Sequence, residues 1–304
     1  MLMWGLTGPI FGAIADRYGG HVAIISSFIF YTLGVYYLYS GPNTGIFFQI
    51  HLGLLIGIGL GGTAISIPMS IVGKHFPLST RTIAMSIVTA VGSFGYFISP
   101  IFTNYSLINY GWNYTLFLFS LFLVTGLIVA FFVRSPKENE IIENRSDQSL
   151  KEALSEALQS KSYILLVSGF FVCGFHITLV GTHVPKYVID RGLEDWTAAA
   201  ILSLIGLFNI FGSLLSGYLS TKIIKKIILS AIYLLRGFSI AFFIFTPPSV
   251  LSAFIFGASF GFLWLSTVPA TSGIVAHLFG TKFLGLLYGI CLLYTSDAAD
   301  DFTS

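Results

Sequence analysis

Long apolar stretches, separated by short polar segments, follow one another along almost the whole chain. Many of them approach the length of about 20 residues that a helix needs to cross the hydrocarbon core of a bilayer. The alternating pattern of membrane β-strands is not seen, and a helix satisfies its own backbone groups in lipid. We therefore predict an all-α membrane protein. The predicted spans are residues 1–15, 22–40, 46–73, 82–104, 112–133, 163–186, 197–220, 227–246, 250–275 and one that starts near 282.

The amino-acid composition also indicates a protein that is surrounded by lipid. Of 304 residues, 55% are hydrophobic and only 9% are charged, whereas a soluble protein carries about 25% charged residues. The formal net charge of +2 gives no reason to expect a nucleic-acid partner. Cys173 and Cys291 have no CxxC or metal-ligand neighbours, so the sequence predicts neither a disulfide nor a metal site, and no cofactor is expected.

Basic residues mark alternate connections between the predicted spans. When the connection after the first span is placed in the cytosol, most of the 15 Lys and Arg residues fall in cytosolic segments, while Lys186 and Arg191 lie outside. The positive-inside rule predicts this asymmetry. Arg236 alone lies within a span, and no acidic residue lies in mid-membrane. We expect a multi-pass protein of a cell inner membrane.

A polar segment at residues 134–162 separates two groups of spans. Within it, Ser149-Leu-Lys-Glu152 has the pattern of a capping box, which predicts the start of a helix. A short amphipathic helix at the inner membrane interface is one interpretation, and a solvated linker helix is the other. Its predicted apolar face consists of Leu150, Leu154, Ala157 and Leu158.

Two short matches relate the first half of the chain to the second. Residues 12–17 (GAIADR) resemble residues 217–222 (GYLSTK), at an offset of 205 positions. Residues 66–70 (SIPMS) resemble residues 267–271 (TVPAT), at an offset of 201. Near-equal offsets predict a duplicated bundle of about six helices per half, and secondary transporters typically bind substrate between such repeats.

The segment at residues 12–20 (GAIADRYGG) resembles the signature loop between helices 2 and 3 of the major facilitator superfamily, roughly G-x-L-A-D-R-x-G-R. It departs at its end, where Gly20-His21 stands in place of the usual basic residue. Further stretches resemble the bacterial branch related to monocarboxylate transporters and oxalate/formate exchangers. They are 173–176 (CGFH), 182–187 (THVPKY), 206–213 (GLFNIFGS), 233–236 (YLLR) and 263–269 (LWLSTVP).

The resemblance implies a bundle of two pseudo-repeated six-helix halves, truncated here to about helices 2–10 plus the start of helix 11. We predict an N-terminal half at 1–133 (helices 2–6), a cytoplasmic central loop with an amphipathic helix at 134–162, and a C-terminal half at 163–290 (helices 7 to the start of 11). Residues 291–304 turn acidic and resemble a translated sequencing-library adapter, so we interpret them as a non-native tail.

The function implied by the resemblance is secondary active transport of a small solute by alternating access, with the chain expected to be a monomer in the lipid bilayer and not an enzyme. The preferred cargo is an organic anion such as a monocarboxylate, moved with or without a coupling proton or ion. An efflux transporter for hydrophobic compounds is the main alternative. A non-transporting membrane sensor or scaffold is a remote one, and an enzyme would need clustered catalytic groups that the sequence lacks.

Several polar residues in the second half are candidates for binding substrate. Arg236 can bind a carboxylate in bidentate fashion or brace backbone carbonyls, since an arginine within a span is costly and usually functional. His176 and His183 share a helix face and can bind anions or carry protons, or can be structural. Trp264 and Thr267 can line a cavity or serve packing. The full candidate set is Arg236, His176, His183, Thr182, Asn209, Trp264 and Thr267.

The signature loop supplies a candidate gate. Asp16 can sit against the positive N-terminus of a neighbouring helix, and the resemblance implies that this contact latches the inward-closed arrangement; a plain cytoplasmic turn is the alternative. The gating residues are Gly12, Asp16, Arg17 and Gly19. Small residues at four-residue spacing predict close helix packing. They are Gly53, Gly57 and Gly61 in one span and Gly257 and Gly261 in another.

Overall fold

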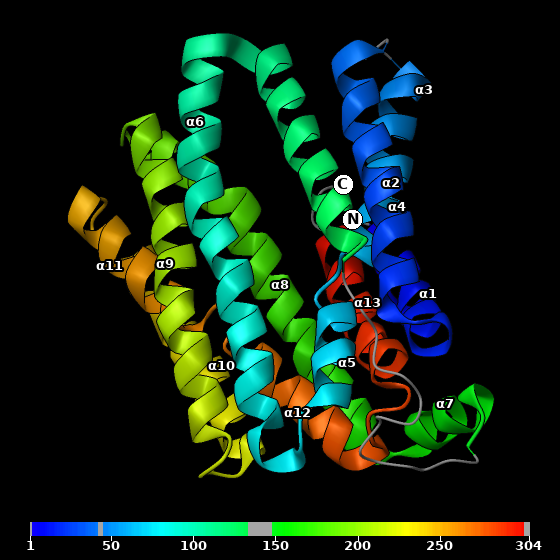
Figure 1. Ribbon diagram of the computed structural model, residues 1–304. Coiled ribbons are helices and arrows are strands. Elements are labelled where there is room, and N and C mark those ends of the chain that lie inside the picture. The colour runs from blue at the N-terminus through cyan, green and yellow to red at the C-terminus, as the bar shows by residue number, and fades with distance from the viewer. Residues whose placement is uncertain (1, 42–44, 133–147, 301–304) are drawn as a thin grey trace. The chain divides into compact units, whose positions relative to one another are not determined.

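The computed structural model describes residues 2–41, 45–132 and 148–300, and within these ranges every regular element is a helix (Figure 1). Seven helical stretches of the described residues are long and apolar enough to cross a membrane. The predicted all-α membrane fold is therefore confirmed. Residues 134–147 of the predicted central loop and the last four residues of the predicted tail lie outside the described ranges.

The first three predicted spans are helical, and the third is interrupted. Residues 63–65 separate two helices inside it. Its first part also includes a π-helical segment, a form that is rare in proteins and is frequently found at functional sites. The elements are α1 (Leu2–Tyr18), α2 (Gly20–Ser40), α3 (Gly45–Phe48), the π-helix η1 (Gln49–Ile56), α4 (Gly57–Gly62) and α5 (Ser66–His75).

The next two predicted spans share the label α6 (Leu78–Ala130), which comprises two helices that meet at Gly111. At a rise of 1.5 Å per residue, its 53 residues would measure about 80 Å, well over twice the hydrocarbon core of about 30 Å. Gly111 interrupts the helical dihedrals with a φ of 78°, which glycine adopts without steric cost. The helix before Gly111 thus extends beyond the predicted end at residue 104.

The capping box at Ser149 is confirmed. The Ser149 hydroxyl accepts the Glu152 N–H at 3.3 Å, and the Ser149 N–H donates to the Glu152 carboxylate at 2.7 Å. This cap starts α7 (Leu150–Gln159), in which Ala153 and Ala157 are buried while Leu158 is exposed. The placement of α7 at the membrane interface stays a prediction.

The rest of the chain follows the predicted spans closely, and the next-to-last span is again interrupted. Residues 264–266 separate its two helices. This break lies 201 positions after the break at 63–65, which is one of the offsets of the sequence repeat. α13 runs past residue 291, and the assignment of 291–304 as a non-native tail stays a prediction. The elements are α8 (Lys161–Asp190), α9 (Asp195–Leu219), α10 (Lys225–Phe245), α11 (Val250–Leu263), α12 (Thr267–Phe279) and α13 (Leu284–Asp300).

By internal contacts the chain divides into two compact units. Unit 1 comprises residues 1–77, 109–174 and 275–304, and unit 2 comprises residues 78–108 and 175–274. In unit 1, α1 (blue) packs along α13 (red), and α2 packs against η1 and α4 (Figure 1). In unit 2, α11 packs against α9 and α10. These units do not coincide with the predicted halves at 1–133 and 163–290, which stay a prediction.

An aromatic ladder forms the core of unit 2. Phe243 stacks on Phe256 with ring centroids 4.3 Å apart, Phe256 stacks on Phe260 at 5.3 Å, and Phe260 meets Trp264 edge to face at 5.4 Å. These rings pack against Ile201 and Ile205 of α9, neither of which is exposed. Unit 1 has a smaller core between α1, α2 and α5, built on Phe11, Ala15, Ala23 and Ile67.

Four of the five predicted packing glycines lie at close helix contacts. A Cβ at Gly261 would lie 2.5 Å from the Ile205 Cα, and one at Gly257 would lie 3.3 Å from the Ile201 carbonyl oxygen. A Cβ at Gly57 or Gly61 would collide with α1. Gly53 differs, because a Cβ there would meet no described atom within 4 Å. Gly53 lies in the π-helical segment, where the wider turn shifts the register of the helix face.

We expect Gly261→Ala to destabilise unit 2. The added methyl group must push apart α9 and α11, and such overpacking costs about 1–3 kcal/mol. Gly237→Ala is the matched control, because a Cβ at exposed Gly237 of α10 meets nothing within 4 Å. Thermal unfolding in detergent should show a lower melting temperature for Gly261→Ala only. Equal melting temperatures would contradict the close contact.

The start of α7 should loosen in acid. The hydrogen bonds from the Ser149 backbone N–H and then its hydroxyl lower the pKa of the Glu152 carboxyl below its ordinary value. Because the folded-state pKa of the carboxyl is lowered, the stabilisation that the cap contributes is fully present above the ordinary pKa. It is lost as the pH falls through the lowered value. A spin label at exposed Ser155 should become more mobile over that acidic window, and Glu152→Gln should abolish the pH dependence.

Candidate functional site

The break between α11 and α12 has a simple origin in the sequence. Pro269 lacks an N–H, and its ring collides with the carbonyl of the residue four positions earlier, Leu265, if the helix continues. The chain instead leaves the helix at residues 264–266, and Val268 N–H donates to the Leu265 carbonyl at 2.9 Å. Pro68 likewise follows the break at 63–65, where Ile67 N–H donates to the Ala64 carbonyl at 3.2 Å, although Pro9, Pro100 and Pro185 lie within continuous helices.

Arg236 of α10 projects onto the second break. Its guanidinium donates to the Leu263 carbonyl through Nε at 3.0 Å and through one terminal nitrogen at 2.6 Å. The same terminal nitrogen donates to the Trp264 carbonyl and lies 3.4 Å from the Thr267 hydroxyl. Arg236 has no exposed surface. Of the two predicted roles, this geometry matches the bracing of backbone carbonyls.

Two side chains of α9 complete the contacts around the break. The Asn209 amide oxygen accepts the Leu265 N–H at 2.8 Å, and its NH₂ group donates to the Ser93 hydroxyl of α6 at 2.6 Å. The Ser216 hydroxyl donates to the Ser266 carbonyl at 2.5 Å. Together with Arg236, these residues satisfy four backbone groups that leave the regular helix ladder. We call Arg236, Asn209 and Ser216 the collar.

The predicted substrate-binding residues fall into two groups. Arg236, Asn209, Trp264 and Thr267 meet at the break and are fully or almost fully buried. His176 on α8 is partly buried, and its Nδ1 has no hydrogen-bond partner among the described residues. Thr182 and His183 are exposed, and Thr182 donates to the Thr178 carbonyl of its own helix. The structure does not bring these two to the break.

The candidate gate is built around the Asp16 carboxylate, whose side chain has no exposed surface. One oxygen accepts from the Ser70 hydroxyl and the Lys74 ammonium group of α5, each at 2.7 Å. The other oxygen accepts the Leu286 N–H in the first turn of α13 at 2.8 Å. A carboxylate at a helix N-terminus is favoured by the helix dipole. Asp16 therefore joins α1, α5 and α13, while its gating role stays a prediction.

The other signature residues have separate positions. Gly12 faces Gly285 of α13 so closely that a Cβ would collide with the Gly285 carbonyl. Gly19 lies between α1 and α2 and has a φ of 98°, in the left-handed region that favours glycine. Arg17 is exposed, with its guanidinium 5.3 Å from the Tyr18 ring centroid.

Sequence reasoning missed Ser216 of the collar and three further residues. Lys74 was counted only as a cytosolic charge, and Ser70 only as part of the repeat, yet both bind Asp16; their four-residue spacing on one helix was the available signal. His51 was not considered. It lies in η1, is 93% buried, stacks on Tyr37 with ring centroids 5.3 Å apart, and has an Nδ1 without a hydrogen-bond partner among the described residues. A histidine within an apolar span is the signal that would have identified it.

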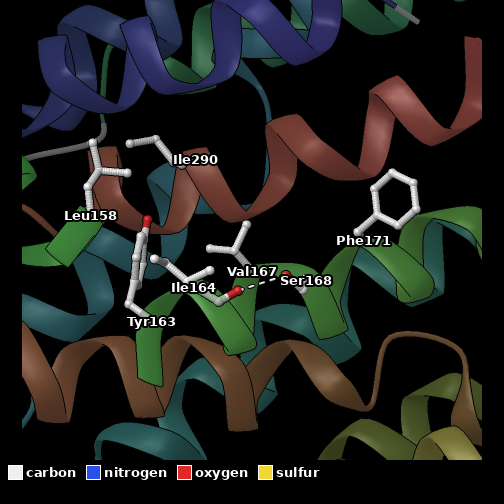
Figure 2. Close-up of a pocket in the computed structure, with 7 residues that line it drawn as sticks. All are labelled: Leu158, Tyr163, Ile164, Val167, Ser168, Phe171 and Ile290. Carbon is white, nitrogen blue, oxygen red and sulfur yellow. Dashed lines mark hydrogen bonds between the residues drawn. The ribbon is translucent and has the colours of Figure 1, made fainter. Parts of the chain in front are cut away.

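A crevice in unit 1 has an apolar wall. It has a volume of about 270 Å³ and lies where the end of α7, the first turns of α8 and α13 meet (Figure 2). Ser168 is one of its few polar residues, and its hydroxyl is bonded to the Ile164 carbonyl of its own helix. Such a wall offers little to a charged solute. The lining residues are Leu158, Tyr163, Ile164, Val167, Ser168, Phe171 and Ile290.

Comparison with known families decides the class of protein. The model of the Major Facilitator Superfamily matches residues 1–296. The chain belongs to the major facilitator superfamily. It is therefore a multi-pass membrane protein of a transporter family, which confirms the superfamily resemblance. Among the described residues, no three His, Cys, Asp or Glu side chains cluster as a metal site would require.

Curated relatives within the superfamily are distant. An MFS-type transporter of Gibberella moniliformis is 26% identical, with 98% of this chain and 70% of the relative covered. Mouse monocarboxylate transporter 6 is 24% identical, over 76% of this chain and 54% of its own length. The sialic acid transporter NanX of Escherichia coli is 25% identical, over 96% and 71%.

Solved structures share the fold. The fucose transporter FucP in its outward conformation has a TM-score of 0.76 at 15% identity, with 99% of this chain and 80% of that chain covered. The human organic anion transporter MFSD10 has a TM-score of 0.73 at 14% identity, with 98% and 73% covered. At these identities the likeness establishes the superfamily fold alone.

Asp16→Ala should destabilise unit 1 because it leaves the buried Lys74 ammonium without its carboxylate. Breaking a buried pair from one side costs about 3–5 kcal/mol. The double variant Asp16→Ala/Lys74→Met should recover part of this loss, since no buried charge then remains from the pair. Thermal unfolding checks both, with Arg17→Ala as a near-neutral control. A double variant no more stable than Asp16→Ala would contradict the pairing.

Proposed function

We propose that this chain forms the main part of a secondary active transporter that moves a small organic anion, such as a monocarboxylate, by alternating access. Membership of the superfamily supports transport of a small solute. The observation that carries the choice of an anion is the buried Arg236 guanidinium within a membrane span. A monomer in a cell inner membrane is part of the same proposal.

The charge pattern of unit 2 favours an anion over a cation. The groups that Arg236 contacts at the break are carbonyl oxygens and a hydroxyl, which are neutral. Acidic residues occur in the seven candidate spans only at their ends, at Asp190 and Asp195. A buried positive charge in a low-dielectric region attracts anions over several ångströms. The interior of unit 2 thus suits a carboxylate.

His176 is the residue we propose to contact the substrate. It is partly exposed, unlike the collar, and its Nδ1 has no hydrogen-bond partner among the described residues. An imidazole can donate to a carboxylate or take up a coupling proton near neutral pH. Arg236, being enclosed by the break, would act on the anion through its field rather than by direct contact.

The names of several relatives agree with an anionic cargo. Two are monocarboxylate transporters, of mouse and of golden hamster, and a third is a sialic acid transporter. Monocarboxylates and sialic acid share a carboxylate group. We take that group as the feature of the substrate that this chain recognises.

Efflux of hydrophobic compounds is the second candidate. The aromatic ladder of Phe243, Phe256 and Phe260 and the apolar crevice in unit 1 favour it. Two relatives are named as efflux proteins, for agnestins in Paecilomyces divaricatus and for fujikurins in Gibberella fujikuroi. The two candidates differ in whether a carboxylate on the cargo is required.

Proteoliposomes containing the transporter of which this chain forms the main part should take up radiolabelled pyruvate or lactate faster than lipid vesicles alone. His176→Gln should lower this uptake about tenfold, since a hydrogen bond to a charged group contributes about 1.5–3 kcal/mol. His183→Gln is the matched control, on the same helix but exposed, and should transport normally.

Two outcomes would contradict the anion proposal. One is uptake of the amide or methyl ester of the same acid at the rate of the acid itself. The other is transport of a hydrophobic dye with no response to any carboxylate, which would support the efflux candidate.

A further inference from the structure

The break at residues 264–266 leaves backbone groups of a membrane span outside the helix ladder. Carbonyl oxygens at the end of α11 have no N–H in the next turn to accept, because the chain changes direction there. In the bilayer core no water replaces the missing donor, and an unsatisfied group costs several kcal/mol. Interrupted helices in transporters commonly use such carbonyl oxygens to coordinate a small cation.

Arg236 occupies the position that such a cation would take. Its guanidinium group contacts the carbonyls of Leu263 and Trp264, and also approaches the Thr267 hydroxyl. The three oxygens belong to the last residue of α11, the first residue of the break and the first residue of α12. Arginine keeps its charge even when buried, and its planar fork of donors suits several acceptors at once.

The other break of the chain shows that the interruption does not need this charge. Pro68 interrupts the span at 63–65 as Pro269 does at 264–266. Shifting Arg236 back by the repeat offsets of 201 and 205 leads to residues 31–35 (YTLGV), which contain no basic residue. Near that break, the Ser66 hydroxyl is buried without a hydrogen-bond partner among the described residues. A proline follows each break, and at the second break the Arg236 guanidinium also contacts the backbone carbonyls.

We propose that the 264–266 break is a cation site whose permanent occupant is the Arg236 guanidinium, a tethered cation that fixes the geometry between α11 and α12. Asn209 and Ser216 hold the remaining backbone groups of the break, so the site is shaped from the α9 side as well. Arg236 is thus a positioning residue. This inference concerns the break itself and holds whether the cargo is an anion or a hydrophobic compound.

Replacement of Arg236 should leave a vacant site that a free cation can fill. We expect Arg236→Ala to lower the melting temperature of the purified chain in detergent. Millimolar methylguanidinium should restore at least half of the loss, whereas methylurea, which has a similar shape but no charge, should restore none. The wild-type chain, measured with the same additives, corrects for their general effect on stability.

Arg191→Ala is the matched control. Arg191 also lies over a tyrosine ring, 5.0 Å from the Tyr187 centroid, as Arg236 lies 5.6 Å from that of Tyr233, but Arg191 is exposed. Its replacement should change the melting temperature little and should give no rescue by methylguanidinium. Rescue of both variants alike would mean that the additive acts elsewhere, and would overturn the proposal.

Two further variants keep the test decisive if Arg236→Ala does not fold. Arg236→Lys retains a charge and should stay folded with intermediate stability. Arg236→Met has a similar length without charge and should be the less stable of the two. The proposal is overturned if Arg236→Met equals or exceeds Arg236→Lys, or if methylurea rescues Arg236→Ala as well as methylguanidinium does.

Discussion

The need to satisfy every backbone polar group inside a bilayer governs this structure. Helices meet it along most of the chain, and the places where a helix is interrupted must meet it by other means. At residues 264–266 the means are side chains from two neighbouring helices, α9 and α10. The polar residues within these apolar spans are therefore explained first by the backbone they serve. Any contact with a solute is built on that support.

Unit 1 satisfies backbone N–H groups at the start of a helix, whereas unit 2 satisfies carbonyl groups. The first N–H groups of α13 lack partners within the helix, and the Asp16 carboxylate accepts one of them while it binds Lys74 and Ser70. In unit 2 the Arg236 cation donates to backbone carbonyls, and in unit 1 the Asp16 anion accepts a backbone N–H. In both units the charged side chain is buried and the complementary partner is the end of a helix.

Hydrophobic runs were enough to predict the spans, but proline alone does not mark an interruption, because Pro9, Pro100 and Pro185 lie within continuous helices. At Pro68 and Pro269 the missing N–H and the clash with the residue four positions earlier are local effects. The partners of the breaks could not be predicted in the same way. Arg236 lies 27 positions before Leu263, and only the packing of α10 on α11 brings them together. Likewise Lys74 was recognisable as a topogenic charge, while its contact with Asp16 depends on how α1 and α5 pack.

The predicted repeat pairs two interruptions that differ in the contacts around them. Each of the two matching segments is interrupted just before its proline, and at the second interruption a buried arginine contacts the backbone. A helix break that is held by side-chain contacts keeps the angle between its two helices, whereas a break without such contacts can bend. An arginine placed at residues 31–35 would show whether a buried charge can hold α4 and α5 at the first interruption as Arg236 holds α11 and α12 at the second.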